Sequence, residues 1–251
     1  VPAAENVLVA SFGKKLKEAN VPGADALVAR AAAIVTEQVY PAEHRLFDLL
    51  AEQGESATHD AGVWRLPNGD ALYNAMIRHL TDTTMTADEI HEIGLAEVTR
   101  IHVEMDAILK AQGLAAGTVG ERMAALAKDP RFFYPNTEEG KAQILADIAK
   151  QVKKVNEESP KWFGTLPKYD LQVRAVPAFS QDSAPGGYYD SPALDGSRPG
   201  TYWINLRDTA IWPKFAVPTL TYHESIPGHH FQNAIALGED APLLMAVMSS
   251  N

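Results

Sequence analysis

The sequence contains no cysteine among its 251 residues. This absence excludes disulfides, thiolate metal ligands and cysteine nucleophiles, so any bound metal ion must be held by His, Asp or Glu. Basic residues are also few, because 22 Lys and Arg stand against 32 Asp and Glu, for a net charge of −10. Binding to phosphates requires concentrated Lys and Arg, and the composition therefore argues against a nucleic-acid partner.

Long apolar runs are missing as well. The longest, residues 26–35 and 241–248, fall far short of the ~18 uninterrupted residues that a membrane-spanning helix needs. We therefore expect no membrane span. The chain begins at Val1 without an initiator Met or a leader, which predicts a start produced by processing or by the choice of where the sequence begins. This start leaves the location open between periplasmic or secreted and cytoplasmic, with a slight preference for periplasmic.

The first 160 residues are helical in character. Thr86 and Glu89 have the spacing of a capping box, and apolar residues follow at helical intervals as far as Ile108. The residue before a proline is driven from the α region, so Tyr40-Pro41 predicts a break between two helices. Composition and apolar spacing predict further helices over residues 11–19, 23–38, 42–53, 71–80, 115–127 and 137–155.

The pattern changes after Pro160. Residues 171–176 and 201–206 predict two strands, and residues 183–200 predict a loop rich in Pro, Gly, Asp and Ser. The fold class we expect is mainly α, as a single domain with a small antiparallel sheet beside the last helix. Within it, residues 1–160 form the helical part, 161–216 the small sheet and loops, and 217–251 the motif helix and tail.

The most informative stretch is H-E-S-I-P-G-H-H at residues 223–230. In the zinc-peptidase motif H-E-x-x-H, two histidines one helical turn apart bind zinc and the glutamate acts as general base. Here Pro227 occupies the position of the second histidine, and a proline followed by glycine should bulge or break the helix. Either His229 or His230 could then join His223 on a metal ion. We favour His229, which leaves His230 to support the site or to face the substrate.

This stretch resembles the bacterial DUF885 proteins, which are predicted zinc-dependent peptidases of the gluzincin type. The resemblance is carried by residues 62–69 (G-V-W-R-L-P-N-G), Tyr73, 86–98, 162–167 (W-F-G-T-L-P), 196–205 (G-S-R-P-G-T-Y-W-I-N) and the motif itself. It implies a mostly helical metallopeptidase fold with Zn²⁺ on His223 and on His229 or His230, and with Glu224 as general base. The stretched spacing is also similar to that of dipeptidyl-peptidase III relatives.

The resemblance further implies a glutamate as third metal ligand on a helix downstream of the motif. In this chain Glu239 and Asp240 follow the motif, in a segment that predicts a turn with solvated acids. A catalytic zinc ion needs three protein ligands. We therefore expect this polypeptide to be the amino-terminal piece of a longer metallopeptidase, whose carboxyl-terminal portion, or a second polypeptide, supplies the missing Glu.

The predicted function is that of a zinc-dependent hydrolase that cleaves peptide bonds by metal-activated water, with Glu224 and His230 as catalytic residues. In gluzincin-like peptidases an edge strand pairs with the extended substrate, which makes Tyr202 and Asn205 of the strand 201–206 the expected substrate-binding residues. Residues 186–189 could form a flap over the site or only a loop. Two alternatives stay open: a metal-dependent amidase or esterase acting on a non-peptide substrate, and a metal-free, inactive helical scaffold subunit.

Overall fold

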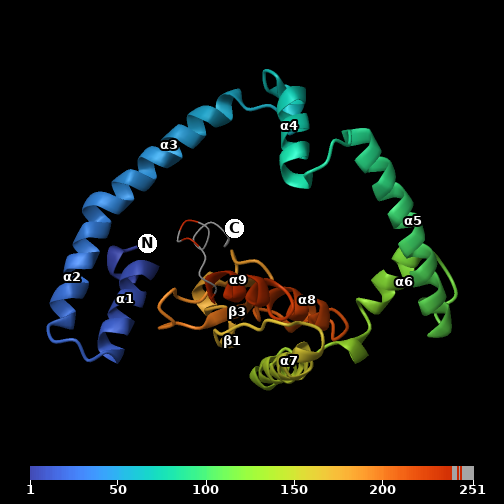
Figure 1. Cartoon of the computed structure of the whole chain (residues 1–251). Helices are drawn as coiled ribbons and strands as arrows, with labels where there is room; N and C mark the ends of the chain where they lie inside the picture. Colours follow the sequence, from blue (N-terminus) through green and yellow to red (C-terminus); the bar gives the residue numbers. More distant parts are fainter. Residues whose placement is uncertain (239–241, 243, 245–251) are drawn as a thin grey trace. The chain divides into compact units, whose positions relative to one another are not determined.

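The computed structural model describes residues 1–238, 242 and 244. The chain divides into two compact units, residues 1–102 and 103–251, which we call unit 1 and unit 2. Helices dominate both units, so the mainly α expectation is confirmed (Figure 1). The expectation of a single domain stays a prediction, because the boundary falls inside one helix, α5 (Ala87–Ala111).

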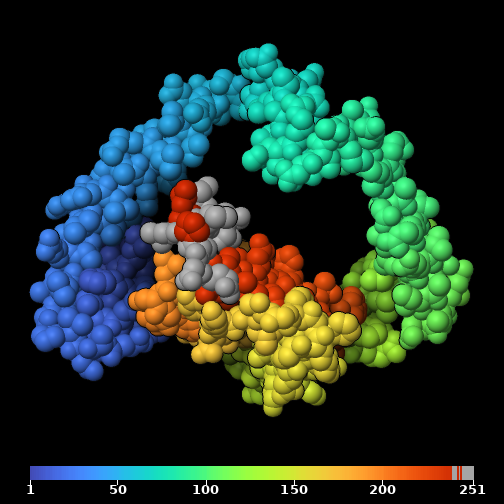
Figure 2. All heavy atoms as spheres, viewed as in Figure 1, coloured from blue at the N-terminus to red at the C-terminus, as the bar shows by residue number. Residues whose placement is uncertain are grey.

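Unit 1 consists of helices with little packing between them. They are α1 (Val7–Glu18), α2 (Ala24–Ile34), α3 (Tyr40–Ser56), α4 (Gly69–Thr81) and the first part of α5. Every residue from Pro41 to Ser56 of α3 is exposed, and Figure 2 shows atoms of this segment, in blue, on the visible face.

The predicted break at Tyr40-Pro41 is wrong. Tyr40 has helical backbone angles (φ −58°, ψ −43°), and a π-helical turn, Val35–Val39, joins α2 to α3. Proline lacks an N–H and displaces the normal i→i−4 hydrogen bond, and a wider π turn just before it accommodates that loss without ending the helix.

The capping box at the start of α5 is confirmed. The Glu89 backbone N–H donates to Thr86 Oγ1 over 3.2 Å, and the Thr86 backbone N–H donates to Glu89 Oε2 over 2.8 Å. These two bonds satisfy donors that a helix start otherwise leaves unpaired.

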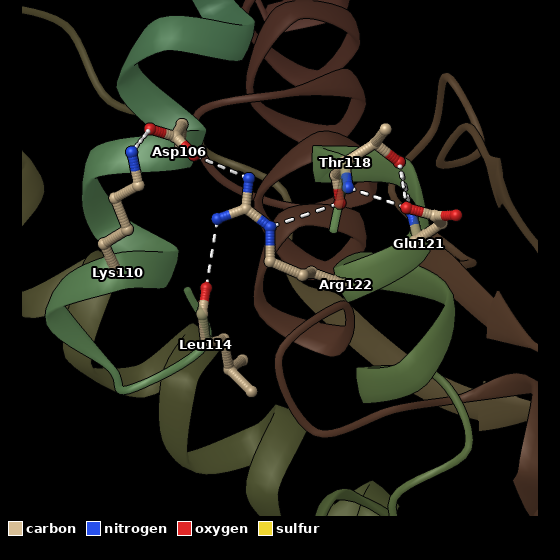
Figure 3. A network of polar contacts seen from close by, with 6 residues as sticks. All are labelled: Asp106, Lys110, Leu114, Thr118, Glu121 and Arg122. Carbon is tan, nitrogen blue, oxygen red and sulfur yellow. Dashed lines mark hydrogen bonds and ion pairs between the residues drawn. The ribbon is translucent and has the colours of Figure 1, made fainter. Parts of the chain in front are cut away.

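In its described residues, unit 2 contains the end of α5 and four further α-helices. They are α6 (Val119–Leu126), α7 (Glu138–Glu158), α8 (Val217–Glu224) and α9 (His229–Gly238). Arg122 links α6 to α5 and is only 6% exposed (Figure 3). Its guanidinium donates to Asp106 Oδ1 over 2.6 Å, to the Leu114 carbonyl over 3.0 Å and to the Thr118 carbonyl over 3.2 Å. One buried side chain thus fixes the corner between α5 and α6.

The sheet of unit 2 has the strand order β1-β3-β2. Its strands are β1 (Leu171–Ala175), β2 (Gly187–Asp190) and β3 (Gly200–Ile204). β1 pairs with β3 in parallel and β2 pairs with β3 antiparallel, so the expectation of an antiparallel sheet is wrong. The reason is an additional strand, β2, which forms inside the predicted loop. The chain reverses between β2 and β3, so β3 is antiparallel to β2 and runs in the same direction as β1.

The core of unit 2 lies between one face of the sheet and α7. Ile144 and Ile148 of α7 are fully buried, as are Tyr202 and Ile204 of the central strand β3. Val217, at the start of α8, belongs to the same core. The core therefore anchors the helix that carries the first residues of the motif.

Candidate metal centre

The motif spans two helices and a tight turn, as the Pro-Gly pair predicts. α8 ends at Glu224, four residues form the turn, and α9 begins at His229. The Ile226–Pro227 peptide bond is cis. The turn is closed by hydrogen bonds from the Gly228 N–H to the Tyr222 carbonyl (3.0 Å) and from the Ser225 hydroxyl to the Thr221 carbonyl.

Gly228 is required by this turn. A Cβ at this position would overlap the backbone carbonyl oxygen of His223, so only glycine lets the returning chain approach α8 this closely. The approach places the start of α9 beside the end of α8, which brings His229 next to His223 even though six positions separate them.

His223, Glu224 and His229 form a cluster that could hold a metal ion. One ring nitrogen of each histidine and one carboxylate oxygen of Glu224 all lie within 4.8 Å of one another. The two imidazole rings meet edge to face, with centroids 4.7 Å apart. Both histidines are exposed, whereas Glu224 is buried. The structure thus brings together the three residues that the motif predicts, with His229 rather than His230 beside His223.

The Glu224 carboxyl group is buried between the two histidines of the cluster and the interior of unit 2. Burial raises the pKa of its carboxyl group, and the neighbouring His229 and His223 oppose that shift. Its Oε2 atom is buried and has no hydrogen-bond partner among the described residues. An unpartnered buried carboxylate oxygen is costly, and a bound cation or its water would satisfy it.

His230 is buried (2% exposed) and is not among the three residues of the cluster. Its Nδ1 lies 2.9 Å from the hydroxyl of Tyr189 on β2, and burial lowers its pKa to about 4. A neutral imidazole bonded in this way holds the Tyr189 ring in place. A Cβ at Gly200 of β3 would overlap the Tyr189 hydroxyl, so this glycine makes room for the bond.

Tyr189 is the residue that sequence reasoning missed. Its ring lies nearly parallel to that of His229, with an interplanar angle of 12° and centroids 6.5 Å apart. Residues 186–189 were expected as a flap or loop, whereas Gly187–Asp190 form the strand β2. No local pattern links Tyr189 to a histidine 41 positions later, and only the pairing of β2 with β3 brings the two together.

The expectation that residues 201–206 form an edge strand is wrong, because β3 has a neighbour on each side. Tyr202 is fully buried in the core, and its hydroxyl has no hydrogen-bond partner among the described residues. The buried Asn205 side chain donates to the carbonyls of Gln181 (2.7 Å) and Ala184 (3.2 Å), which stabilises the loop before β2. The structure thus gives Tyr202 and Asn205 positions inside unit 2.

Three further observations concern the rest of the chain. Among the described residues, the cluster at 223–229 is the one grouping of at least three ligand-type side chains close enough to share a metal ion. Glu239 and Asp240, the acids expected in a turn after the motif, lie outside the described residues. No helix within the described part of the chain has the length and apolar character needed to cross a membrane.

Fold and site together define a mainly helical protein with a candidate His-Glu-His metal centre at a helix break. The sequence matches the family model described as "Bacterial protein of unknown function (DUF885)" over residues 2–251. The chain belongs to the DUF885 family.

A solved structure supports this fold. The crystal structure of a protein described as a candidate lipoprotein from Colwellia psychrerythraea is 40% identical in sequence and matches with a TM-score of 0.90. The match covers 94% of this chain and 41% of that one, so the chain spans less than half of the relative's length. Among curated proteins none matches the sequence.

Proposed function

We propose that this chain carries the metal-binding portion of a zinc-dependent hydrolase that cleaves peptide bonds. The observation that carries the proposal is the convergence of His223, Glu224 and His229 within 4.8 Å across the turn between α8 and α9. Cysteine is absent from the sequence, and imidazole nitrogen is a preferred zinc ligand.

The residues fit a zinc ion in this proposal. His223 and His229 would hold it, and the unpartnered Oε2 of Glu224 supports the presence of a cation or its water next to the carboxylate. A catalytic zinc site has three protein ligands and one open position. We propose that the third ligand is a glutamate from outside the described residues, supplied by a further portion of a longer protein or by a second polypeptide.

In the proposed reaction, the zinc ion and the side chains of this protein have different roles. Zinc, when bound, supplies Lewis acidity that makes water acidic near neutral pH and polarises a carbonyl group. Glu224 accepts the proton of the attacking water and passes it to the leaving amine, a role supported by its burial and raised pKa. His230 acts as a positioning residue, because its bond to Tyr189 fixes the aromatic ring beside His229.

The outer edge of β2 is a suitable surface for an extended peptide. The Asn205 N–H donates to the Gly186 carbonyl (2.7 Å), and the antiparallel register continues from that pair. The alternation in such a ladder turns the backbone N–H and C=O of Gly187 and Tyr189 away from β3. We therefore propose that substrate pairs with β2, and not with β3.

A peptide-hydrolysis assay tests this function. The chain is incubated together with the portion proposed to supply the third ligand, as the longer protein, with zinc and a mixed peptide library, and new termini are detected by mass spectrometry. We expect cleavage that chelation abolishes and that Glu224→Gln slows by about 100-fold or more, since general-base catalysis contributes at least that much. His91→Ala, an exposed histidine on α5, serves as the matched control and should cleave normally.

Three results would contradict this assignment. Cleavage that survives in Glu224→Gln would exclude the proposed base. Hydrolysis of esters or non-peptide amides without cleavage of peptides would replace the peptidase assignment by an amidase or esterase. A folded longer protein, with the third-ligand portion present, that hydrolyses none of these substrates would favour a scaffold role.

A further inference from the structure

The face of the sheet that points away from the core carries a hollow of about 590 Å³. Gln172 and Arg174 of β1, Trp203 of β3 and Asp190 of β2 line it, and Tyr189 and Arg198 complete its wall. All of these residues belong to unit 2 and lie within the described part of the chain. The function proposed above does not use this hollow.

The charged lining of the hollow has a positive excess. Two arginines face one acid there, in a chain whose net charge is −10. The acid is already engaged, because Asp190 Oδ2 accepts a 2.7 Å hydrogen bond from Trp203 Nε1. Neither arginine forms an ion pair with any described residue. Arg174 instead lies over the Trp203 ring, 5.3 Å from its centroid.

The floor of the hollow is ordered and polar. Gln172 Nε2 donates to the hydroxyl of Thr201, which is buried, over 2.8 Å. The Tyr188 ring stacks on Trp203 on the same face, with centroids 6.2 Å apart. Guanidinium groups held over or near such a floor are suited to bind a carboxylate through paired N–H donors.

Tyr189 connects the hollow to the candidate metal centre. Its ring lies against His229 on one side, and the residue also lines the hollow. Tyr189 is therefore common to the lining of the hollow and the surroundings of the metal centre.

We infer that this hollow binds a carboxylate of the ligand through Arg174 and Arg198. The inference rests on the proposed function in one respect, which is that the ligand is a peptide paired with β2. Side chains of an extended peptide alternate between the two faces of a sheet. When one residue faces the metal centre, its neighbour faces the side of the hollow. The carboxylate would be the side chain of that neighbour or the carboxyl terminus of the peptide.

Binding of four matched peptides tests this inference. They share one sequence, contain either Glu or Gln, and end in either a free acid or an amide. Isothermal titration with the 251-residue chain in EDTA measures affinity without turnover. We expect one carboxylate-bearing form to bind about tenfold or more tightly than its neutral counterpart. A difference between the Glu and Gln peptides identifies a side-chain carboxylate as the bound group, and a difference between the free-acid and amide peptides identifies the terminal carboxylate.

Substitutions of the two arginines test whether they cause the preference for a carboxylate. Arg198→Gln and Arg174→Gln should each remove most of it, whereas Arg45→Gln, an exposed arginine of α3 with the same change in charge, should retain it. Equal affinity for all four peptides, absence of binding, or a preference that persists in both hollow variants would overturn the inference. The binding assay contains EDTA and therefore does not depend on a bound metal ion. If hydrolysis fails but the preference for a carboxylate is retained, the proposed function is refuted and the inference about the hollow stands.

Discussion

The two units differ in how their helices are stabilised. In residues 1–102 the buried apolar side chains are Val9 and Val35, whereas large apolar side chains of α3, α4 and the first part of α5 are exposed. In unit 2 a contiguous core joins α7, the sheet and α8. Buried apolar area is the main source of folding free energy, so unit 2 holds its site in place by its own packing. Unit 1 depends more on local helix stabilisation.

Matched isoleucine truncations should give the largest difference between the units. Ile148 of α7 is 0% exposed and Ile93 of α5 is 50% exposed. Ile148→Ala should lower the free energy of unfolding by about 2–5 kcal/mol, because it removes buried methyl groups and leaves a cavity. Ile93→Ala should cost less than about 1 kcal/mol. Urea unfolding followed by tryptophan fluorescence measures both, and equal losses would contradict the contrast.

Matched glycine substitutions should give the next largest effect. Gly228→Ala places a methyl group against the His223 carbonyl and should cost about 1–3 kcal/mol. It should also reduce zinc binding, because the turn that brings His229 to His223 must shift. Gly94→Ala in α5 meets no atom within 4 Å and should stabilise its helix by up to about 1 kcal/mol. Thermal unfolding and zinc titration of both variants check this, and unchanged zinc affinity in Gly228→Ala would refute the geometry.

Removing an ion pair of α5 should lower stability more in unit 2 than in unit 1, by a smaller difference than the substitutions above. Hydrogen bonds from Lys110 and Arg122 lower the pKa of Asp106 (Figure 3). A lowered folded-state pKa contributes stability above the ordinary pKa of about 4, and that stability is lost as pH falls through the folded value. Asp106→Asn should therefore destabilise unit 2 at pH 7 and flatten its acid unfolding below about pH 4.

The control for this pair lies in unit 1. Glu97 pairs with Arg100 over 2.8 Å, and both side chains are more than half exposed. Glu97→Gln should change stability by roughly 0–1 kcal/mol, as exposed ion pairs do. Urea midpoints measured from pH 3 to pH 7 compare the two variants. A larger loss in Glu97→Gln than in Asp106→Asn at pH 7 would reverse the expected order.

The exposed faces of unit 1 should have the smallest effect on stability and a clear effect on dye binding. Phe47 and Leu50 of α3 are both more than half exposed. The chain should bind the apolar dye ANS, and a Phe47→Ser/Leu50→Ser variant should bind less of it with an unchanged unfolding midpoint of unit 2. Undiminished ANS fluorescence in that variant would show that the dye reports on another surface.

The features that sequence reasoning predicted are those with local causes. The capping box of Thr86 and Glu89 and the helix break at Pro227 depend on residues within one turn of each other. Most helices lie near their predicted ranges for the same reason. His223, Glu224 and His229 were predicted because a known ligand geometry limits which spacings can meet across a broken helix.

The features that sequence reasoning missed depend on tertiary contacts. The strand β2 has only four residues and takes its conformation from pairing with β3. The helix continues through Pro41 because a π turn accommodates the proline. The role of Tyr189 depends on its bond to His230, and that partner is set by the sheet register.

Metal stoichiometry tests the central claim most directly. The chain and its variants are dialysed against zinc, and bound metal is measured by elemental analysis. The account predicts close to one zinc ion per chain in the unmodified protein, in Glu224→Gln and in the His91→Ala control, and loss of zinc in His223→Ala and His229→Ala. A folded chain that binds no zinc, or zinc retained in both histidine variants of the cluster, would contradict it.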